Sequence, residues 1–522
     1  MPHGRRGITI TVAIALVLLG RAASIASAEP IQFRVWLDGA AAKEPIAGRL
    51  YVFVSQRMRG EPRFGPDWFQ PEPFFGLDVA TFQPGTSCQI DDRADGFPDK
   101  LSRLRPGRYR VQAVLHHDFY SPNPGRGEGN VFGDAVWLDL NPSAGGTIDL
   151  VLRHVVPPQP FPPSTWVKEV AVPSELLSEF HGREVIERAA VVLPPSYDHE
   201  PGRRYPAVYV VPGFSGSYRG GQWMPLTGPR EAEPGEVELI RVMLDGQCHW
   251  GHHVYANSET NGPRGDALVR ELIPYIDQNY RTVAAPTARF VTGHSSGGWS
   301  SLWLQVSYPE VFGGVWSSSP DPVDFRDFQG IDVYANPPQS MYHDEQGNRR
   351  PIARRGSQPI LWYDSFARMD DCLGRGGQLR SFEAVFSPRG PDGLPRKLWD
   401  RTTGRIDPEV ARAWRKHDIC ALLAENWDTL GPQLEGKLHV VVGGLDTFYL
   451  EGAVHGLAQT LQQLRSDAQI EFLPGRDHGT VLTPDQWRKR RRQMGEVFLR
   501  HHGEDASVGE NTAAPRDLIL SR

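Results

Sequence analysis

Arg289-Phe-Val-Thr-Gly-His-Ser-Ser-Gly-Gly298 is the stretch that decides the fold of this chain of 522 residues. A short apolar run leads into residues 293–297, which have the pattern G-x-S-x-G. This spacing is typical of a sharp strand-to-helix turn, because glycines on both sides of the serine let the backbones approach without a clashing Cβ atom. Apolar residues then recur at helical spacing up to Val306. We therefore expect a strand, a turn that exposes the Ser295 hydroxyl, and a helix.

Two later strands end in the partners that a nucleophilic serine needs. The apolar run 437–443 is followed by Asp446, and the run 469–473 is followed by His478. The chain order serine, acid, histidine places all three residues at the carboxyl ends of strands. In this interpretation His478 removes the proton of Ser295, and Asp446 orients the imidazole. The other acids that follow nearby strands are Glu451, Asp321 and Asp324.

Two backbone N–H groups are needed to stabilise an oxyanion. One is expected from Ser296, the residue after the nucleophile. The other usually comes from the loop after the third strand, and the buried run 205–211 ends here in Pro212-Gly-Phe-Ser-Gly216. We assign this second donor to the backbone of Phe214, with an ordinary glycine turn as the alternative.

The segment Gln247-Cys-His-Trp-Gly-His-His253 holds three histidines within five residues. A metal site is one interpretation, but the spacing fits no common zinc motif. A loop at this edge of the sheet can instead line a substrate cleft. We therefore predict no metal and no organic cofactor, and name His252, His253 and Trp299 as candidate substrate-binding residues.

The chain divides into segments of different character. Residues 29–156 contain short alternating strands between Pro/Gly turns, which predict a β-sandwich. A Pro-rich linker follows at 157–164. Strands and helices alternate over 165–502, which indicates an α/β domain, except that 322–435 departs from this rhythm and is expected to form a cap-like insertion over the site. Residues 503–522 are expected to be a disordered tail.

Several motifs resemble a known family of esterases. They are Leu193-Pro-Pro-Ser-Tyr, Tyr205-Pro-Ala-Val-Tyr-Val-Val-Pro-Gly, Glu271-Leu-Ile-Pro-Tyr-Ile, Gly293-His-Ser-Ser-Gly-Gly and Tyr308-Pro-Glu-Val-Phe. The family includes enterochelin esterases, feruloyl esterases, S-formylglutathione hydrolases and mycolyltransferases, and the resemblance covers residues 165–325 and 435–485. It implies an α/β-hydrolase fold and an acyl-enzyme mechanism. The family often has histidine where this chain has Pro212, and its insertions are usually shorter than 322–435.

The first residues have the pattern of an export signal. Arg5 and Arg6 precede an apolar segment too short to span a bilayer, and Ala26-Ser-Ala28 resembles a cleavage site. We expect residues 1–28 to be a signal peptide, the mature chain to have no membrane span, and the protein to be periplasmic or secreted. The net charge of −6 is mild and argues against a nucleic-acid partner.

Export permits disulfide bonds between the cysteines, which are Cys88, Cys248, Cys372 and Cys420. The first expected pairing is Cys372–Cys420, because both residues lie in the insertion, and free buried thiols are the alternative. The sequence has no C-x-x-C pair, which argues against a zinc or redox site based on cysteine.

These observations predict an exported serine hydrolase that cleaves small-molecule or glycan-linked carboxylic esters through an acyl-enzyme intermediate. A peptidase of the prolyl-oligopeptidase type is one alternative, and a non-catalytic binding protein on a hydrolase scaffold is another. The sequence leaves open the particular ester, hydrolysis against acyl transfer, and the oligomeric state.

Overall fold

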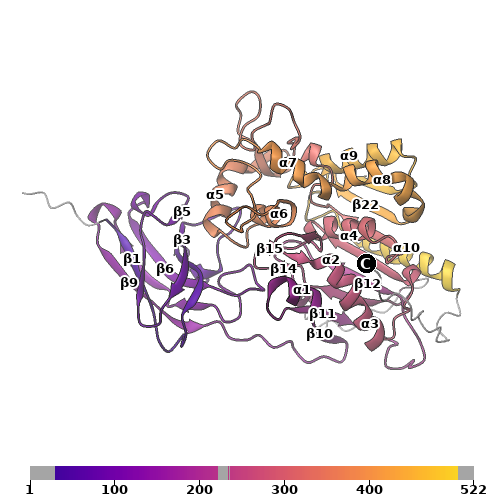
Figure 1. Ribbon diagram of the computed structural model, residues 1–522, viewed down its shortest axis with the longest axis horizontal. Coiled ribbons are helices and arrows are strands. Elements are labelled where there is room, and N and C mark those ends of the chain that lie inside the picture. Colours follow the sequence, from indigo (N-terminus) through magenta and orange to yellow (C-terminus); the bar gives the residue numbers. More distant parts are fainter. Residues whose placement is uncertain (1–29, 222–232, 234–235, 504–522) are drawn as a thin grey trace, which may run out of the picture.

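The computed structural model describes residues 30–221, 233 and 236–503. The predicted signal peptide lies outside the described residues, and so does the predicted tail beyond residue 503. Figure 1 shows the N-terminal β domain (indigo) at one end, the α/β domain at the other, and the insertion (orange) packed against both. No helix in the described ranges is long and apolar enough to cross a membrane.

One continuous sheet forms the N-terminal domain. In the described residues its nine strands are β1 (Gln32–Leu37), β2 (Ile46–Ser55), β3 (Phe74–Phe82), β4 (Ser87–Ile90), β5 (Asp95–Phe97), β6 (Gly107–His116), β7 (Val131–Gly133), β8 (Val136–Leu140) and β9 (Thr147–Val155). The order is β4-β1-β9-β7-β6-β2-β3-β5, and β8 pairs with β6. Strands β1 and β9 run parallel, and the other pairs are antiparallel.

Alternating side chains explain the core of this domain. Phe33 and Val35 of β1 are buried, and so are Leu50 and Val52 of β2. Because successive strand residues point to opposite faces, each half of the sheet presents one apolar face. Both sets of residues belong to a single hydrophobic cluster. The predicted β-sandwich therefore takes the form of one sheet whose two halves share a core.

The second domain contains a mixed sheet of eight strands in the described ranges. They are β10 (Val167–Pro173), β11 (Ile186–Val192), β13 (Ile240–Leu244), β12 (Ala207–Val211), β18 (Arg289–His294), β19 (Gly314–Ser318), β22 (Leu438–Gly443) and β23 (Gln469–Leu473), given in their order across the sheet. The strands from β13 to β23 are parallel, while β10 and β11 are antiparallel additions at one edge. This is the sheet of an α/β-hydrolase fold, as predicted.

Helices cover both faces of this sheet. In chain order the helices of this domain outside the insertion are α1 (Glu175–His181), which packs on α2, then α2 (Arg264–Ala267), α3 (Ile273–Asn279), α4 (Ser296–Ser307), α9 (Glu451–Gln463) and α10 (Pro484–His502). Phe290 of β18 and Trp316 of β19 pack against Met494 and Phe498 of α10, whereas α4 lies on the opposite face. Burial on both faces explains why these strands are almost continuously apolar.

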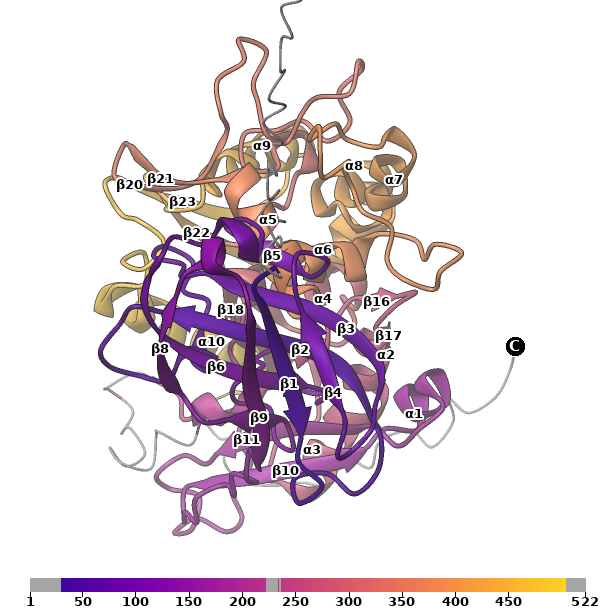
Figure 2. The same cartoon turned by 90° about the vertical axis from the view of Figure 1, so that its left-hand side faces the viewer.

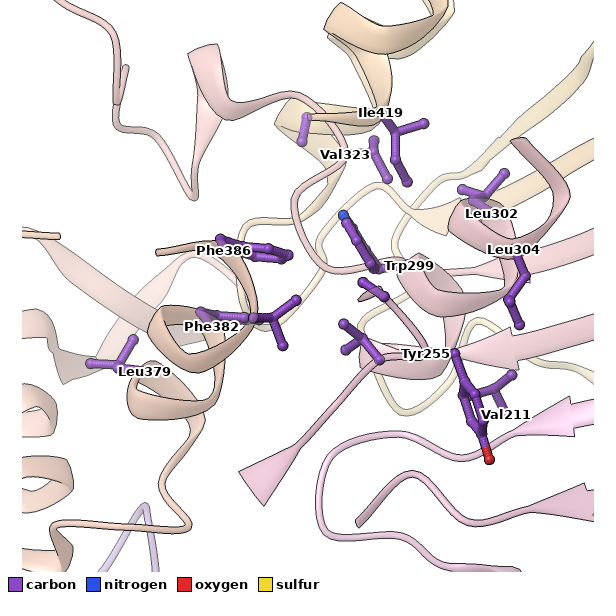
Figure 3. Packing of buried hydrophobic residues seen from close by; sticks show 14 of the residues in the cluster. Val211, Tyr255, Trp299, Leu302, Leu304, Val323, Leu379, Phe382, Phe386 and Ile419 are labelled. Atoms are coloured by element: carbon purple, nitrogen blue, oxygen red, sulfur yellow. The ribbon is translucent and has the colours of Figure 1, made fainter. Parts of the chain in front are cut away.

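The insertion contains the hairpin β20 (Pro351–Arg355) and β21 (Gln358–Trp362), followed by α5 (Tyr363–Leu373), α6 (Gln378–Phe386), α7 (Pro408–Trp414) and α8 (Ile419–Leu434). Figure 3 shows α6 and α8 packed against the elbow helix α4, with Phe386 beside Trp299. The ring centroids of these two residues are 5.2 Å apart. The insertion is therefore fixed to the helix that follows Ser295.

The insertion also packs against the N-terminal domain, because β5 and α5 lie side by side in Figures 1 and 2. Arg49 of β2 is only 4% exposed, and its guanidinium lies 2.6 Å from the carboxylate of Asp95. The same guanidinium donates a 2.9 Å hydrogen bond to the carbonyl of Cys372 at the end of α5. A buried charge with such partners is costly to separate, so the two parts form one packed unit.

Candidate active site

The predicted elbow is present between β18 and α4. Ser295 has φ 61° and ψ −127°, a conformation that a non-glycine residue adopts only under strain. A Cβ atom on Gly293 would lie 2.0 Å from the carbonyl oxygen of Gly297, and one on Gly297 would lie 2.1 Å from that of Val211. The two glycines are therefore required by backbone contact, and they hold the Ser295 side chain outward at the end of the strand.

His478 and Asp446 are brought together from the ends of β23 and β22. The His478 Nδ1 atom lies 2.8 Å from Asp446 Oδ2, while Asp446 Oδ1 accepts a 2.9 Å hydrogen bond from the Phe448 backbone. Asp446 is fully buried. Because the carboxylate accepts at Nδ1, the imidazole presents Nε2 as the free nitrogen, which is the arrangement that a general base needs.

The other candidate acids have different partners. Glu451 forms an ion pair with Arg354, whose Nε also donates a 2.9 Å hydrogen bond to the Asp446 carbonyl. Asp324 is paired with Arg326 at 2.6 Å. Asp321 accepts a hydrogen bond from the Ser296 hydroxyl at 2.6 Å. Of the four acids named from the sequence, Asp446 is the one bonded to His478.

Ser295 and His478 line the same cavity of about 490 Å³. His294 lies there too, with its ring centroid 4.5 Å from that of His478. Burial, followed by the nearby His478, lowers the pKa of His294 to about 4, so His294 is neutral at physiological pH. A neutral neighbour adds no charge that would oppose protonation of His478 during a reaction.

The two predicted oxyanion donors come from two segments that meet at Ser295, the start of α4 and the loop after β12. Ser296 is the first residue of α4, where backbone N–H groups lack partners within the helix. Phe214 lines the cavity in the loop after β12. A Cβ atom on Gly213 would lie 3.2 Å from the carbonyl oxygen of His294, so this loop packs closely against the elbow.

His252 lies behind the loop that carries Phe214. Its Nδ1 accepts a hydrogen bond from the Val254 backbone at 2.9 Å, which leaves Nε2 as the protonated nitrogen. Nε2 lies 2.9 Å from the carbonyl of Pro212 and therefore donates to it. Burial lowers the pKa of His252 to about 4, which keeps this neutral tautomer. The residue fixes the loop from the inside.

The structure does not bring the three predicted substrate-binding residues to the cavity wall. His252 and His253 are each 1% exposed, and the His253 Nε2 atom lies 3.1 Å from the carbonyl of Asp245. Trp299 is also 1% exposed and stacks on Trp303 at 5.2 Å. These three side chains pack against buried neighbours, and they therefore belong to the core that supports the site.

Sequence reasoning missed the residues that form much of the cavity wall. They come from the N-terminal domain and from the insertion as well as from the α/β domain, and include Trp68, Pro122, Phe366, Leu373, Phe382 and Phe448. The sequence does show Trp68, Phe69, Phe74 and Phe75 as a group of aromatic residues, for which loop anchoring is the favoured interpretation and stacking on a sugar the alternative. Only the contact between the domains reveals that Trp68 belongs to the site.

The expected disulfide bond Cys372–Cys420 is wrong, since all four cysteines are described and all are free thiols. The Sγ atom of Cys372 contacts the carbonyl of Phe74 at 3.4 Å, whereas that of Cys420 lies 3.0 Å from the Thr460 hydroxyl. The two thiols therefore face different parts of the molecule. Within the described residues, no group of three or more His, Cys, Asp or Glu side chains could hold a metal ion.

The sheet and the strand-turn-helix elbow define a hydrolase of the α/β class. Residues 186–494 match the family model named Esterase. This match covers more than half of the chain, and the protein therefore belongs to this esterase family of serine hydrolases.

Individual relatives match over shorter stretches. Esterase Rv1288 of Mycobacterium tuberculosis (strain ATCC 25618 / H37Rv) is 32% identical over 148 residues, which are 28% of this chain and 32% of that protein. The chain thus spans about a third of the length of this curated relative.

Solved structures of esterases are also similar to the chain. A ferulic acid esterase has a TM-score of 0.39 at 12% identity, over 64% of this chain and 98% of that one. An S-formylglutathione hydrolase from Agrobacterium tumefaciens has a TM-score of 0.34 at 14% identity, over 66% of this chain and 95% of that one.

Proposed function

We propose that the protein is an exported serine carboxylesterase that acts through Ser295, His478 and Asp446. The single observation that carries the proposal is the bond between His478 and the fully buried Asp446, at the cavity that Ser295 also lines. Such a pair orients an imidazole toward a serine that would otherwise be a poor nucleophile. Family membership supports ester hydrolysis in general.

In the proposed first step the Ser295 Oγ attacks the ester carbonyl carbon, and His478 Nε2 takes the hydroxyl proton. The backbone N–H groups of Ser296 and Phe214 would stabilise the oxyanion, and His478 would return the proton to the leaving alcohol. Asp446 keeps the imidazole oriented and stabilises its charged form. The acyl group is then bonded to Ser295.

The second step repeats this chemistry with water as the nucleophile. His478 removes a proton from the water, the oxyanion forms again, and the carboxylic acid leaves as Ser295 recovers its proton. An alcohol in place of water would give acyl transfer through the same atoms. The partition between hydrolysis and transfer can be measured by product analysis with an added alcohol.

The test of this proposal is intact-mass spectrometry after treatment with a fluorophosphonate probe, alongside turnover of p-nitrophenyl acetate. One adduct and turnover are expected for the wild type, and neither for Ser295→Ala. Ser215→Ala is the matched control, because Ser215 lines the same cavity but does not stand at the turn between β18 and α4. Folded wild-type protein without adduct or turnover would support the binding-protein alternative instead.

An ester panel and a peptide panel separate the esterase from the peptidase alternative. A peptidase of the prolyl-oligopeptidase type would carry a propeller, whereas the described N-terminal residues form one nine-stranded sheet. We expect turnover of esters without turnover of matched peptides. Export of the chain with removal of residues 1–28 is checked by N-terminal sequencing of the mature protein.

A further inference from the structure

The cavity beside Ser295 has walls from three parts of the chain that are distant in sequence. Phe64 and Trp68 come from the N-terminal domain, Phe214 and Phe448 come from loops of the α/β domain, and Phe366 and Phe382 come from the insertion. Aromatic side chains therefore face the cavity from each part. A volume of about 490 Å³ is within the range of sites that enclose a small organic molecule.

Trp68 is at the meeting point of these walls. Its ring centroid lies 5.4 Å from that of Phe214, 5.0 Å from that of Phe366 and 6.3 Å from that of Phe448. Phe448 in turn packs edge-on against His478 at 5.0 Å. Trp68 of the N-terminal domain thus contacts Phe214, the expected oxyanion donor, and Phe366 of the insertion. It also contacts Phe448, which packs against the expected base His478.

The wall that carries Trp68 is held in place by buried contacts. Arg49 is 4% exposed and donates to the carbonyl of Cys372, and the Tyr51 hydroxyl donates to the carbonyl of Leu373. Leu373 itself lines the cavity. Because both bonds reach the end of α5, the N-terminal domain is fixed at the point where the cavity is formed.

The charge of the cavity restricts what it can hold. Among the described residues that line it there is no lysine or arginine, and Asp321 is the one acid. Burial raises the pKa of Asp321 to about 6. A negatively charged group would find no cation to compensate its desolvation, whereas an uncharged hydrocarbon group would find apolar contact on several sides.

We propose that the site takes esters with a bulky, uncharged hydrocarbon group, and that Trp68 of the N-terminal domain is the residue that selects for this group. The inference rests on the proposed esterase function. It assigns Trp68 to substrate recognition and not to the chemical steps, because an indole ring packed on Phe214 and Phe448 offers apolar contact and takes no part in acyl transfer. Small acyl groups would react without using this wall.

The experiment compares p-nitrophenyl acetate with p-nitrophenyl octanoate for the wild type and for Trp68→Ala. We expect Trp68→Ala to lower kcat/KM for the octanoate about 10- to 100-fold, since the apolar contact between the acyl chain and the partly buried indole is lost. The acetate value should change by less than about threefold. Trp68→Phe should keep most of the octanoate activity, and Trp137→Ala, an exposed tryptophan on β8, is the matched control.

A second comparison tests charge at constant size. The p-nitrophenyl ester of an acyl chain ending in carboxylate should react at least about tenfold more slowly than the neutral ester of equal length. Equal losses for acetate and octanoate in Trp68→Ala, or no loss for either, would overturn the assignment of Trp68. Fluorophosphonate labelling separates the two proposals: labelled protein with unchanged selectivity rejects only this inference, and unlabelled wild type rejects the esterase itself.

Discussion

The hydroxyl of Ser296 donates a 2.6 Å hydrogen bond to the carboxyl of Asp321, beside the serine at the elbow. Asp321 is 7% exposed, and the side-chain amide of Gln378 lies 3.4 Å from the same carboxyl oxygen. The residue expected to donate its backbone N–H to an oxyanion is therefore tied by its side chain to a buried acid. This bond fixes the first turn of α4 from the cavity side.

The ionisation of Asp321 predicts a pH-dependent stability. Burial raises the pKa of this carboxyl from 3.8 to about 6, so between these values the unfolded chain loses the proton and the folded chain keeps it. The folded state then binds more protons, and the free energy of unfolding falls as pH rises through this window, by up to about 3 kcal/mol. Asp321→Asn should lack this loss and gain stability over the wild type from pH 4 to pH 7.

Urea unfolding at several pH values measures this difference. Asparagine keeps an oxygen that can accept from Ser296, so the variant isolates the ionisation from the hydrogen bond. A difference between variant and wild type that stays constant from pH 4 to pH 7 would contradict the prediction.

Replacing Asp446 tests its pairing with His478. Asp446→Asn should lower kcat about 10³- to 10⁴-fold, because an amide no longer stabilises the charged imidazole or fixes its tautomer. Glu451→Gln is the control, since Glu451 pairs with Arg354 and not with the histidine. Its kcat should stay within about tenfold of the wild type. Steady-state kinetics with one ester measures kcat for both variants. A larger loss of kcat in Glu451→Gln than in Asp446→Asn would make Glu451 the acid that acts with His478.

Replacing Gly297 with alanine tests how closely the strand and the helix must approach at the elbow. In Gly297→Ala the new Cβ atom would lie 2.1 Å from the carbonyl oxygen of Val211, so the strand and the helix must separate. We expect a loss of more than about 3 kcal/mol in the free energy of unfolding. Gly202→Ala is the control, because nothing lies within 4 Å of its added Cβ atom. Equal melting temperatures for the two variants would show that the elbow tolerates a side chain.

Replacing His252 is expected to lower turnover, although the side chain is buried behind the loop of Phe214 and does not line the cavity. His252→Ala removes the donor to the Pro212 carbonyl and should loosen the loop of Phe214, which lowers kcat about tenfold with little change in KM. His252→Gln places an amide N–H near the position of Nε2 and should restore most of the activity. A rise in KM alone would indicate a binding role instead.

Much of the α/β domain was predictable because its signals are local. The run before Ser295 is apolar on both faces, which predicts a buried strand. The glycines on both sides of the serine are needed because a side chain there would clash in a sharp turn. Strand, turn and helix can therefore be predicted from neighbouring residues. Asp446 and His478 could be named because each follows a strand of the parallel sheet, and parallel strands end at one edge. The structure pairs these two side chains.

The cavity wall could not be predicted in this way. Trp68 meets Phe366 where the N-terminal domain packs on the insertion, a contact that also joins Arg49 to Cys372 far along the chain. The expected bond Cys372–Cys420 failed for the related reason that two residues of one segment can face opposite neighbours. His252 was predicted to touch substrate, yet its two ring nitrogens are used by backbone groups. Sequence distance carries no information on such contacts.

The wall formed by Trp68 also has a consequence for the order of folding. The residues that face each other across it, Trp68 and Phe366, are separated by almost three hundred positions, and contacts of such long range are slow to form. A freshly synthesised chain can complete the sheet of the α/β domain and still lack one side of its cavity. The proposed selectivity for bulky esters would therefore appear late in maturation, and it would report the docking of the domains more directly than the content of secondary structure.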